Sequence, residues 1–162
     1  MFNDIYNSCL NNSTRNTSCN KNRKSLSVIN SVLINEAVVA SNSLIPFDTT
    51  RIYITDDIIK LDNKNFKICT SGIYKVSFST NARLYIGETN ENIALAICIN
   101  GNVIPGTITK KRCGPNEVVN LHTQVIFAVA SGTTANVSII NIKDNTPTIV
   151  CDNANIIIEK IW

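Results

Sequence analysis

The chain has 162 residues and a mass of 17.8 kDa, the size of one ordinary domain. It carries 15 basic and 12 acidic residues, one histidine and a formal net charge of +3, and it is rich in isoleucine (25) and asparagine (24). No apolar run is long enough for a transmembrane helix, and we expect no classical secretory signal. A single histidine and scattered carboxylates weigh against most hydrolytic enzymes.

Residues 1–25 differ in composition from the rest of the chain. They hold four basic residues against Asp4, a net charge of +3, whereas residues 26–162 hold 11 residues of each sign. We therefore predict a polar, basic, cysteine-containing arm or connector at 1–25 and one folded domain at 26–162. The arm's cations lie among asparagine and serine without stacking aromatic residues, so no nucleic-acid partner is predicted.

Apolar residues gather at the start of this arm. Phe2, Ile5, Tyr6 and Leu10 give it an apolar edge, and two cysteines, Cys9 and Cys19, also lie within it. These apolar residues are candidates for an assembly interface, because an apolar edge on a polar arm requires something to cover it.

The body of the chain consists of short runs rich in β-branched residues, separated by asparagine, glycine or proline. The runs expected as strands are 26–34, 36–41, 51–55, 57–61, 65–69, 72–79, 92–100, 103–104, 117–130, 134–143 and 153–161. Tyr74, Val76 and Phe78 alternate with Ile73, Lys75, Ser77 and Ser79 in the clearest of these runs. The Asn100-Gly101 pair predicts a type I′ hairpin. The basic residues 110–112 are expected in a solvated loop. With no helical spacing in the chain, we predict an antiparallel jelly-roll sandwich of about 8–10 strands with an extended N-terminal arm.

Six cysteines carry the most specific chemistry. None has C-x-x-C spacing and there is one histidine, so neither a metal site nor a cofactor is predicted. Cys98 has small neighbours, Ala94 and Ala96, and is expected to be a buried thiol. Three cysteines fall at expected strand ends or loops and are placed at the rim: Cys69, Cys113 and Cys151. With Cys9 and Cys19 they are candidates for disulfides between subunits, although pairing within one subunit fits equally well.

Catalytic residues are hard to find. His122 sits on the polar face of an expected strand, where a surface or interface role is the ordinary one. Asp56 and Asp57 are adjacent and therefore point to opposite faces of a strand, so they cannot share one site. Trp162 is a large apolar group at the end of the last strand, and we predict that it packs in the core or against a neighbouring subunit. We predict no enzymatic activity.

The order of these landmarks resembles the jelly-roll head shared by complement's first component and tumour necrosis factor, and looks closest to the C-terminal head of collagen-like exosporium glycoproteins. The motifs that carry the likeness are LIPFDTT (44–50), SGIYKVSFS (71–79), NIALAICINGNVIPGT (92–107), QVIFAVASGTTANVSIIN (124–141) and ANIIIEKIW (154–162). The cysteine-bearing arm stands where the collagen-like region precedes such heads. In this respect the chain resembles endospore appendage pilins, whose N-terminal connectors join subunits.

The resemblance implies a self-assembling structural subunit of a spore- or cell-surface filament, joined by its arm and by disulfides. The expected partners are further copies of the chain and other spore-surface proteins, with no membrane partner, and the expected location is the surface after mother-cell lysis. Two alternatives are a compact homotrimeric head that binds a receptor or glycan, and a phage or adhesin tip module. Two sheet faces are candidate contacts: Ala94, Ala96 and Cys98, or Asn120, His122 and Gln124.

Overall fold

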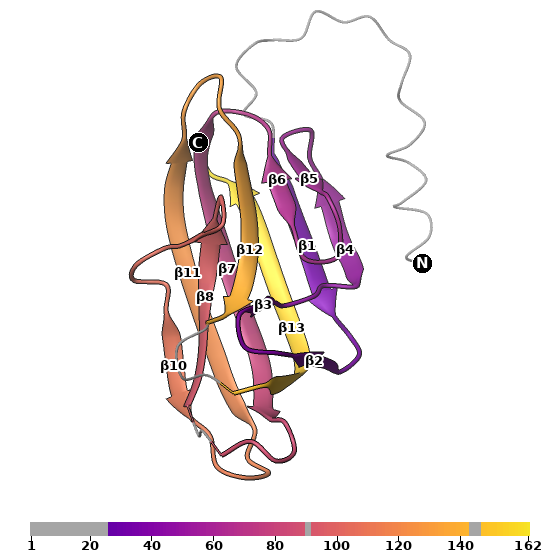
Figure 1. Cartoon of the computed structure of the whole chain (residues 1–162). Coiled ribbons are helices and arrows are strands. Elements are labelled where there is room, and N and C mark those ends of the chain that lie inside the picture. The colour runs from indigo at the N-terminus through magenta and orange to yellow at the C-terminus, as the bar shows by residue number, and fades with distance from the viewer. Residues whose placement is uncertain (1–25, 90–91, 143–146) are drawn as a thin grey trace, which may run out of the picture.

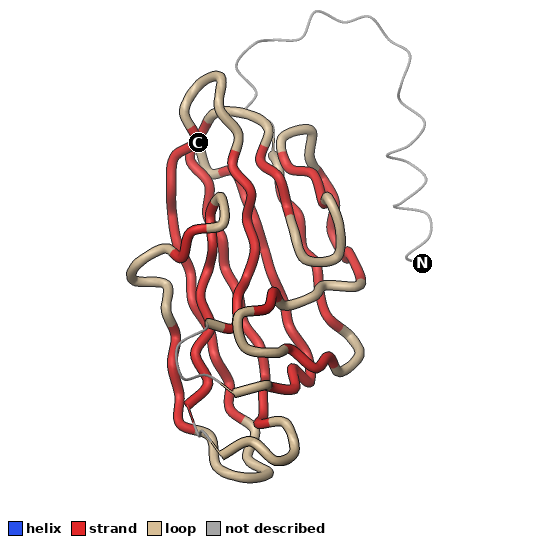
Figure 2. Tube along the Cα trace, in the orientation of Figure 1, coloured by secondary structure: helices blue, strands red, loops and turns tan. Residues whose placement is uncertain are grey.

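The structure, a computed structural model, describes residues 26–89, 92–142 and 147–162 (Figure 1). These ranges contain thirteen strands and no helix (Figure 2). The strands are β1 (Val28–Leu33), β2 (Ala37–Val39), β3 (Ser43–Leu44), β4 (Thr49–Ile54), β5 (Ile58–Lys60), β6 (Phe66–Ile68), β7 (Gly72–Leu84), β8 (Asn92–Ile99), β9 (Asn102–Val103), β10 (Thr109–Arg112), β11 (Val119–Val129), β12 (Ala135–Asn141) and β13 (Ile149–Lys160). The predicted arm, with Cys9, Cys19 and its apolar residues, lies outside the described part of the chain.

Two antiparallel sheets pack face to face, which confirms the predicted all-β jelly-roll sandwich (Figure 1). Sheet A has the order β11, β7, β13, β1, β4, and β2 also pairs with β13. Sheet B has the order β10, β8, β12, β6, β5, with β3 paired to β12 and β9 paired to β8. Strands distant in sequence are therefore neighbours in space, as in β13 between β1 and β7.

The core lies between the two sheets and follows the alternation of the strands. Tyr74, Val76 and Phe78 on β7 are buried, while the residues between them are partly exposed, which confirms the predicted alternation. Phe47 joins the sheets, with its ring 5.8 Å from the ring of Phe66 and 6.3 Å from that of Phe78, in edge-on geometry. Alternating side chains thus give sheet A one buried and one outward face along β7.

Two turns depend on backbone conformations that few residues adopt. Asn100 (φ 52°) and Gly101 (φ 77°) connect β8 to β9, and the pair of positive φ angles confirms the predicted type I′ hairpin. Gly72 (φ 150°) begins β7, and a Cβ at this position would lie 2.5 Å from the carbonyl oxygen of Trp162. That oxygen accepts a hydrogen bond from Ile73 N (2.8 Å), so Gly72 is what lets the chain end close against β7.

Three differences between the expected strands and the structure are the most informative. Residues 110–112 were expected in a loop, but they belong to β10, which pairs with β8 through Leu95 and Thr109. β13 begins at Ile149 rather than near residue 153, so Cys151 lies inside a strand. β7 continues five residues beyond the predicted end at Ser79. In each case pairing with a distant strand extends the ladder through residues whose local pattern looks irregular.

Candidate functional site

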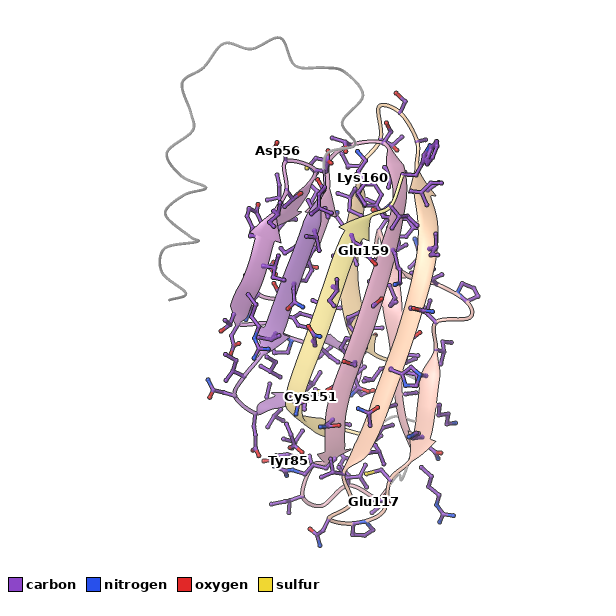
Figure 3. The ribbon with its side chains drawn as sticks, turned by 180° about the vertical axis from the view of Figure 1, so that it is seen from behind. Asp56, Tyr85, Glu117, Cys151, Glu159 and Lys160 are labelled. Atoms are coloured by element: carbon purple, nitrogen blue, oxygen red, sulfur yellow. The ribbon has the colours of Figure 1, made fainter. Side chains whose placement is uncertain are left out.

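The outer face of sheet A is hollowed along β7, between β11 and β13. Figure 3 shows the molecule from this side. Two rows of residues paired across the three strands line the hollow: His122–Ser79–Asn155 and Gln124–Ser77–Ile157. Because the serines on β7 are shorter than their neighbours on both sides, they leave a depression of about 570 Å³, and Gly106 reaches its rim. The position of the hollow is therefore set by the register in which β11, β7 and β13 pair.

Little net charge surrounds this hollow. The next row along the strands holds Ile126, Lys75 and Glu159, with the Lys75 and Glu159 side chains 3.2 Å apart. This ion pair is about one-third exposed, so it adds little to stability, but each charge compensates the other. Ile126 is 61% exposed. The face thus offers short polar groups, aliphatic side chains and no uncompensated charge in these three rows.

Two asparagine oxygens on this side of sheet A are buried without a donor. Asn155 pairs across the strands with Val32, and Asn30 pairs with Ile157, so the two asparagines are diagonal neighbours on β13 and β1. The Oδ1 atoms of Asn30 and Asn155 accept no hydrogen bond from the described residues. An unsatisfied buried acceptor costs about 1–3 kcal/mol, and both of these oxygens lie below the surface, where a partner docked on this face would not reach them.

Asn120, His122 and Gln124 were predicted to point away from the core along one strand. The structure confirms this orientation: all three are exposed on β11. The other predicted face is wrong as an assembly surface, because Ala94, Ala96 and Cys98 are already buried within the chain.

The burial on β8 has a plain geometric cause. Ala94 pairs with Lys110, Ala96 with Ile140, and Cys98 with Val103. Each short side chain is thus flanked across the sheet by a longer one. Of the two predicted faces, only the one on β11, with Asn120, His122 and Gln124, is accessible.

A buried polar cluster at one end of the sandwich was not predicted from the sequence. Asp57 accepts hydrogen bonds from the Ser27 hydroxyl (2.6 Å), the Thr70 hydroxyl (2.5 Å) and Lys160 Nζ (3.3 Å). Thr70 also shares a hydrogen bond with the Tyr74 hydroxyl (2.9 Å). Lys160 belongs to β13 of sheet A, whereas Asp57 precedes β5 of sheet B, so the cluster ties the two sheets together.

The ionisation of Asp57 follows from this environment. Burial raises the pKa of Asp57, but the hydrogen bonds from Ser27, Thr70 and Lys160, together with the lysine charge, outweigh it and lower the pKa below its ordinary value. Asp57 is 7% exposed, whereas Asp56 beside it is exposed, so the adjacent carboxylates do face different surroundings, as predicted. The Asp57 carboxylate already accepts hydrogen bonds from three donors within the chain, which fits a structural role.

The cysteines occupy different environments from those expected. Cys98 is buried, as predicted, and burial raises the pKa of its thiol. The placement of Cys113 and Cys151 at the rim is wrong, since both side chains are fully buried in the core. Burial raises the pKa of Cys113 and raises that of Cys151 to about 11, which keeps both thiols protonated and unreactive.

Half-buried Cys69 keeps its expected position, directly after β6. The four cysteines in the described ranges are free thiols. An inter-subunit disulfide through Cys69, Cys9 or Cys19 stays a prediction.

Trp162 does not pack in the core. Its side chain is 70% exposed, although its backbone is held to Ile73 on β7. The prediction that Trp162 packs in the core is wrong, because β13 ends at Lys160 and the last two residues extend beyond the core. Contact with a neighbouring subunit stays a prediction for Trp162.

Two further kinds of site, a metal centre and a membrane-spanning helix, are absent from the described residues. No group of three or more histidine, cysteine or acidic side chains is arranged to hold a metal ion in this part of the chain. Over the same residues, no helix combines the length and apolar character that crossing a bilayer requires.

Comparison with known proteins identifies the fold. The structure is similar to the globular domain of zebrafish complement 1qA (TM-score 0.60, 10% identity, covering 84% of this chain and 97% of that one). It is also similar to the Eiger TNF of S. frugiperda (TM-score 0.59, 8% identity, 85% and 92% covered) and to murine APRIL (TM-score 0.54, 11% identity, 84% and 99% covered).

The predicted likeness to complement- and tumour-necrosis-factor-like jelly-roll heads is therefore confirmed at the level of the fold. By sequence, no family model and no curated protein matches the chain. The resemblance to exosporium glycoproteins and appendage pilins stays a prediction.

Proposed function

We propose that the chain is a structural subunit that associates with copies of itself through the outer face of sheet A, forming a homotrimeric head. The observation that carries the proposal is the hollow along β7, where short polar groups lie beside Ile157, with Ile126 exposed in the neighbouring row of β11. Surfaces of this kind gain from a partner that fills the hollow and donates hydrogen bonds. A trimer is what the resemblance to complement-like heads implies.

We place the assembly at the spore or cell surface, with other spore-surface proteins as partners and no catalytic activity, on the strength of the resemblance to exosporium heads. Receptor or glycan binding would then belong to surfaces that the trimer leaves exposed. A filament is the second candidate function, and the observation that favours it is the open edge of strand β4 at the end of sheet A.

Size-exclusion chromatography with light scattering, on the full-length chain with reductant present, measures the mass of the assembly and so tests the association. We expect the smallest species to be the trimer, with a mass of about 53 kDa for three chains of 17.8 kDa each. Ser77→Arg places a long cation in the hollow and should remove the trimer, and it should not unfold the chain because Ser77 points outward and is not needed for the core.

Asn136→Arg is the matched control, since Asn136 is exposed on β12 of the other sheet. It should leave the trimer intact. A monomeric wild type at micromolar concentration, or a Ser77→Arg variant that still forms trimers, would overturn the proposal.

A further inference from the structure

Sheet A ends in an unprotected apolar edge. Among the described strands, β4 pairs with β1 alone, so its other edge is open. Three consecutive residues on it, Ile52, Tyr53 and Ile54, are 44%, 54% and 53% exposed. Because neighbouring residues of a strand point to opposite sides, apolar groups flank the open backbone on both faces. An edge of this kind is a template for an added strand.

The other edges of the described sheets are short, charged or covered, and β2, β3 and β9 are only two or three residues long. β10, at one end of sheet B, exposes Lys110, Lys111 and Arg112, and charged residues on an edge discourage pairing. β5, at the other end, is three residues long. β11 is packed against β10, which closes that side of the sandwich. β4 carries Arg51, but a register shift between β1 and β4 sets it apart from Ile52–Ile54. Only β4 therefore combines length, apolar side chains and an open ladder.

We propose that residues 2–10 of a neighbouring copy cover β4 as an added strand of sheet A. The proposal deepens the proposed self-association and rests on it, since it links subunits at a second surface. In an extended segment, Phe2, Tyr6 and Leu10 share one face, while Ile5 and Cys9 share the other. The segment thus has apolar groups for both faces of β4, as strand addition requires.

The chain's length permits this contact. Val28, the first residue of β1, pairs with Ile54, so each chain enters its domain beside the end of its own β4. Residues 11–25 separate the apolar segment from the domain and, when extended, span up to about 50 Å. The 13-residue strand β7 is about 43 Å long at strand geometry. The connector can therefore carry residues 2–10 across the full length of an adjacent subunit.

Charge favours the same contact. Residues 11–25 contain four cations and no acid: Arg15, Lys21, Arg23 and Lys24. Residues 48–62, which hold β4 and β5, contain four aspartates and two cations: Asp48, Asp56, Asp57, Asp62, Arg51 and Lys60. Asp57 is buried and paired with Lys160, so the remaining three aspartates and two cations give this segment a charge of −1 against +4 on the connector. Opposite charges steer the encounter and fix the partner surface, while the apolar strand supplies the contact.

Hydrogen exchange on the full-length chain, under reducing conditions, tests the docking site. Backbone amides of residues 51–54 should exchange about tenfold more slowly in the wild type than in a Phe2→Asp/Tyr6→Asp arm variant. Light scattering should show masses above that of the trimer for the wild type and not for the arm variant or Ile52→Lys/Ile54→Lys. Ile59→Lys, on the short edge strand β5, is the matched control and should behave as wild type.

Mixing the two defective variants identifies which chain supplies the strand. The β4 variant retains an intact arm and the arm variant retains an intact β4, so their mixture should regain masses above that of the trimer. Protection of residues 51–54 without such rescue would show that each arm covers its own β4, which overturns the proposal. Equal exchange in the wild type and the arm variant would also overturn it.

The same measurements separate this proposal from the proposed function. If the arm and β4 variants remain trimers, the trimer contact is independent and only the link between subunits has been removed. If the wild type forms links that both variants abolish, but Ser77→Arg changes nothing, the strand addition stands and the trimer through the outer face of sheet A fails.

Discussion

Asp57 ties sheet A to sheet B, and Asp57→Asn is expected to destabilise the fold while keeping the side chain's shape. The carboxylate accepts two hydroxyl hydrogen bonds and one from Lys160, all within 3.3 Å. A hydrogen bond to a charged group contributes about 1.5–3 kcal/mol. Asparagine keeps one acceptor oxygen, so one hydroxyl bond and the ion pair are lost. Because Lys160 is partly exposed, we discount the ion pair and expect a loss of about 2–3 kcal/mol.

Urea unfolding at a fixed protein concentration measures this loss, since association would shift apparent stability. In a chain of this length, the expected difference corresponds to a fall in Tm of roughly 5–10 °C. Asp56→Asn is the matched control: Asp56 is exposed beside the cluster and should change the unfolding free energy by less than about 0.5 kcal/mol.

The pH dependence gives a second, independent check. The pKa of Asp57 is lower in the folded chain than its ordinary value. Its stabilising contribution is therefore complete above the unfolded pKa of about 3.9 and is lost as the pH falls through the folded pKa. The difference between wild type and Asp57→Asn should shrink below about pH 4. Equal unfolding free energies at pH 7, or a difference that is constant down to pH 2, would refute the reasoning.

Two further predictions concern the chain end and the thiols. Gly72→Ala should lower the unfolding free energy by about 1–2 kcal/mol more than Gly132→Ala, because both glycines have positive φ but only Gly72 has Trp162 O within 2.5 Å of a new Cβ. Equal losses in thermal unfolding would contradict the contact. Among the described cysteines, half-buried Cys69 should be alkylated at least about tenfold faster than Cys113 and Cys151 at pH 8, as read by peptide mass spectrometry, and urea should remove the difference.

The fold was accessible from the sequence because its strands repeat local signals. Alternation on β7 and the Asn100-Gly101 pair are short-range features, and both predict what the structure shows. β10 fails this test: an edge strand with Lys110 and Lys111 exposed has the polarity of a loop, and only its pairing with β8 reveals it. The alternation of apolar and polar residues predicts a strand that buries one face, and it gives no signal for a strand that buries neither face.

The candidate site was accessible only in part, for a related reason. Alternation on β11 predicts that His122 and Gln124 face outward, yet the hollow depends on Ser77 and on register with β7 and β13, which no single run contains. The Asp57 cluster likewise draws its donors from the chain's beginning, middle and end. Cys151 was misplaced because a register shift between Cys151 and Asn153 interrupts the pattern of β13.

The two proposed contacts use parts of sheet A that do not overlap. The hollow follows β7, and β4 is three strands away, a distance of about 14 Å at the usual spacing of paired strands. A contact through the face around the hollow can close into a ring and then stop. An arm reaching a neighbour's β4 need not close, because the arm and the edge that receives it are different surfaces of the subunit. A closed trimer that keeps its β4 edges open could therefore be joined to others, which would reconcile a compact head with a filament built from the same chain.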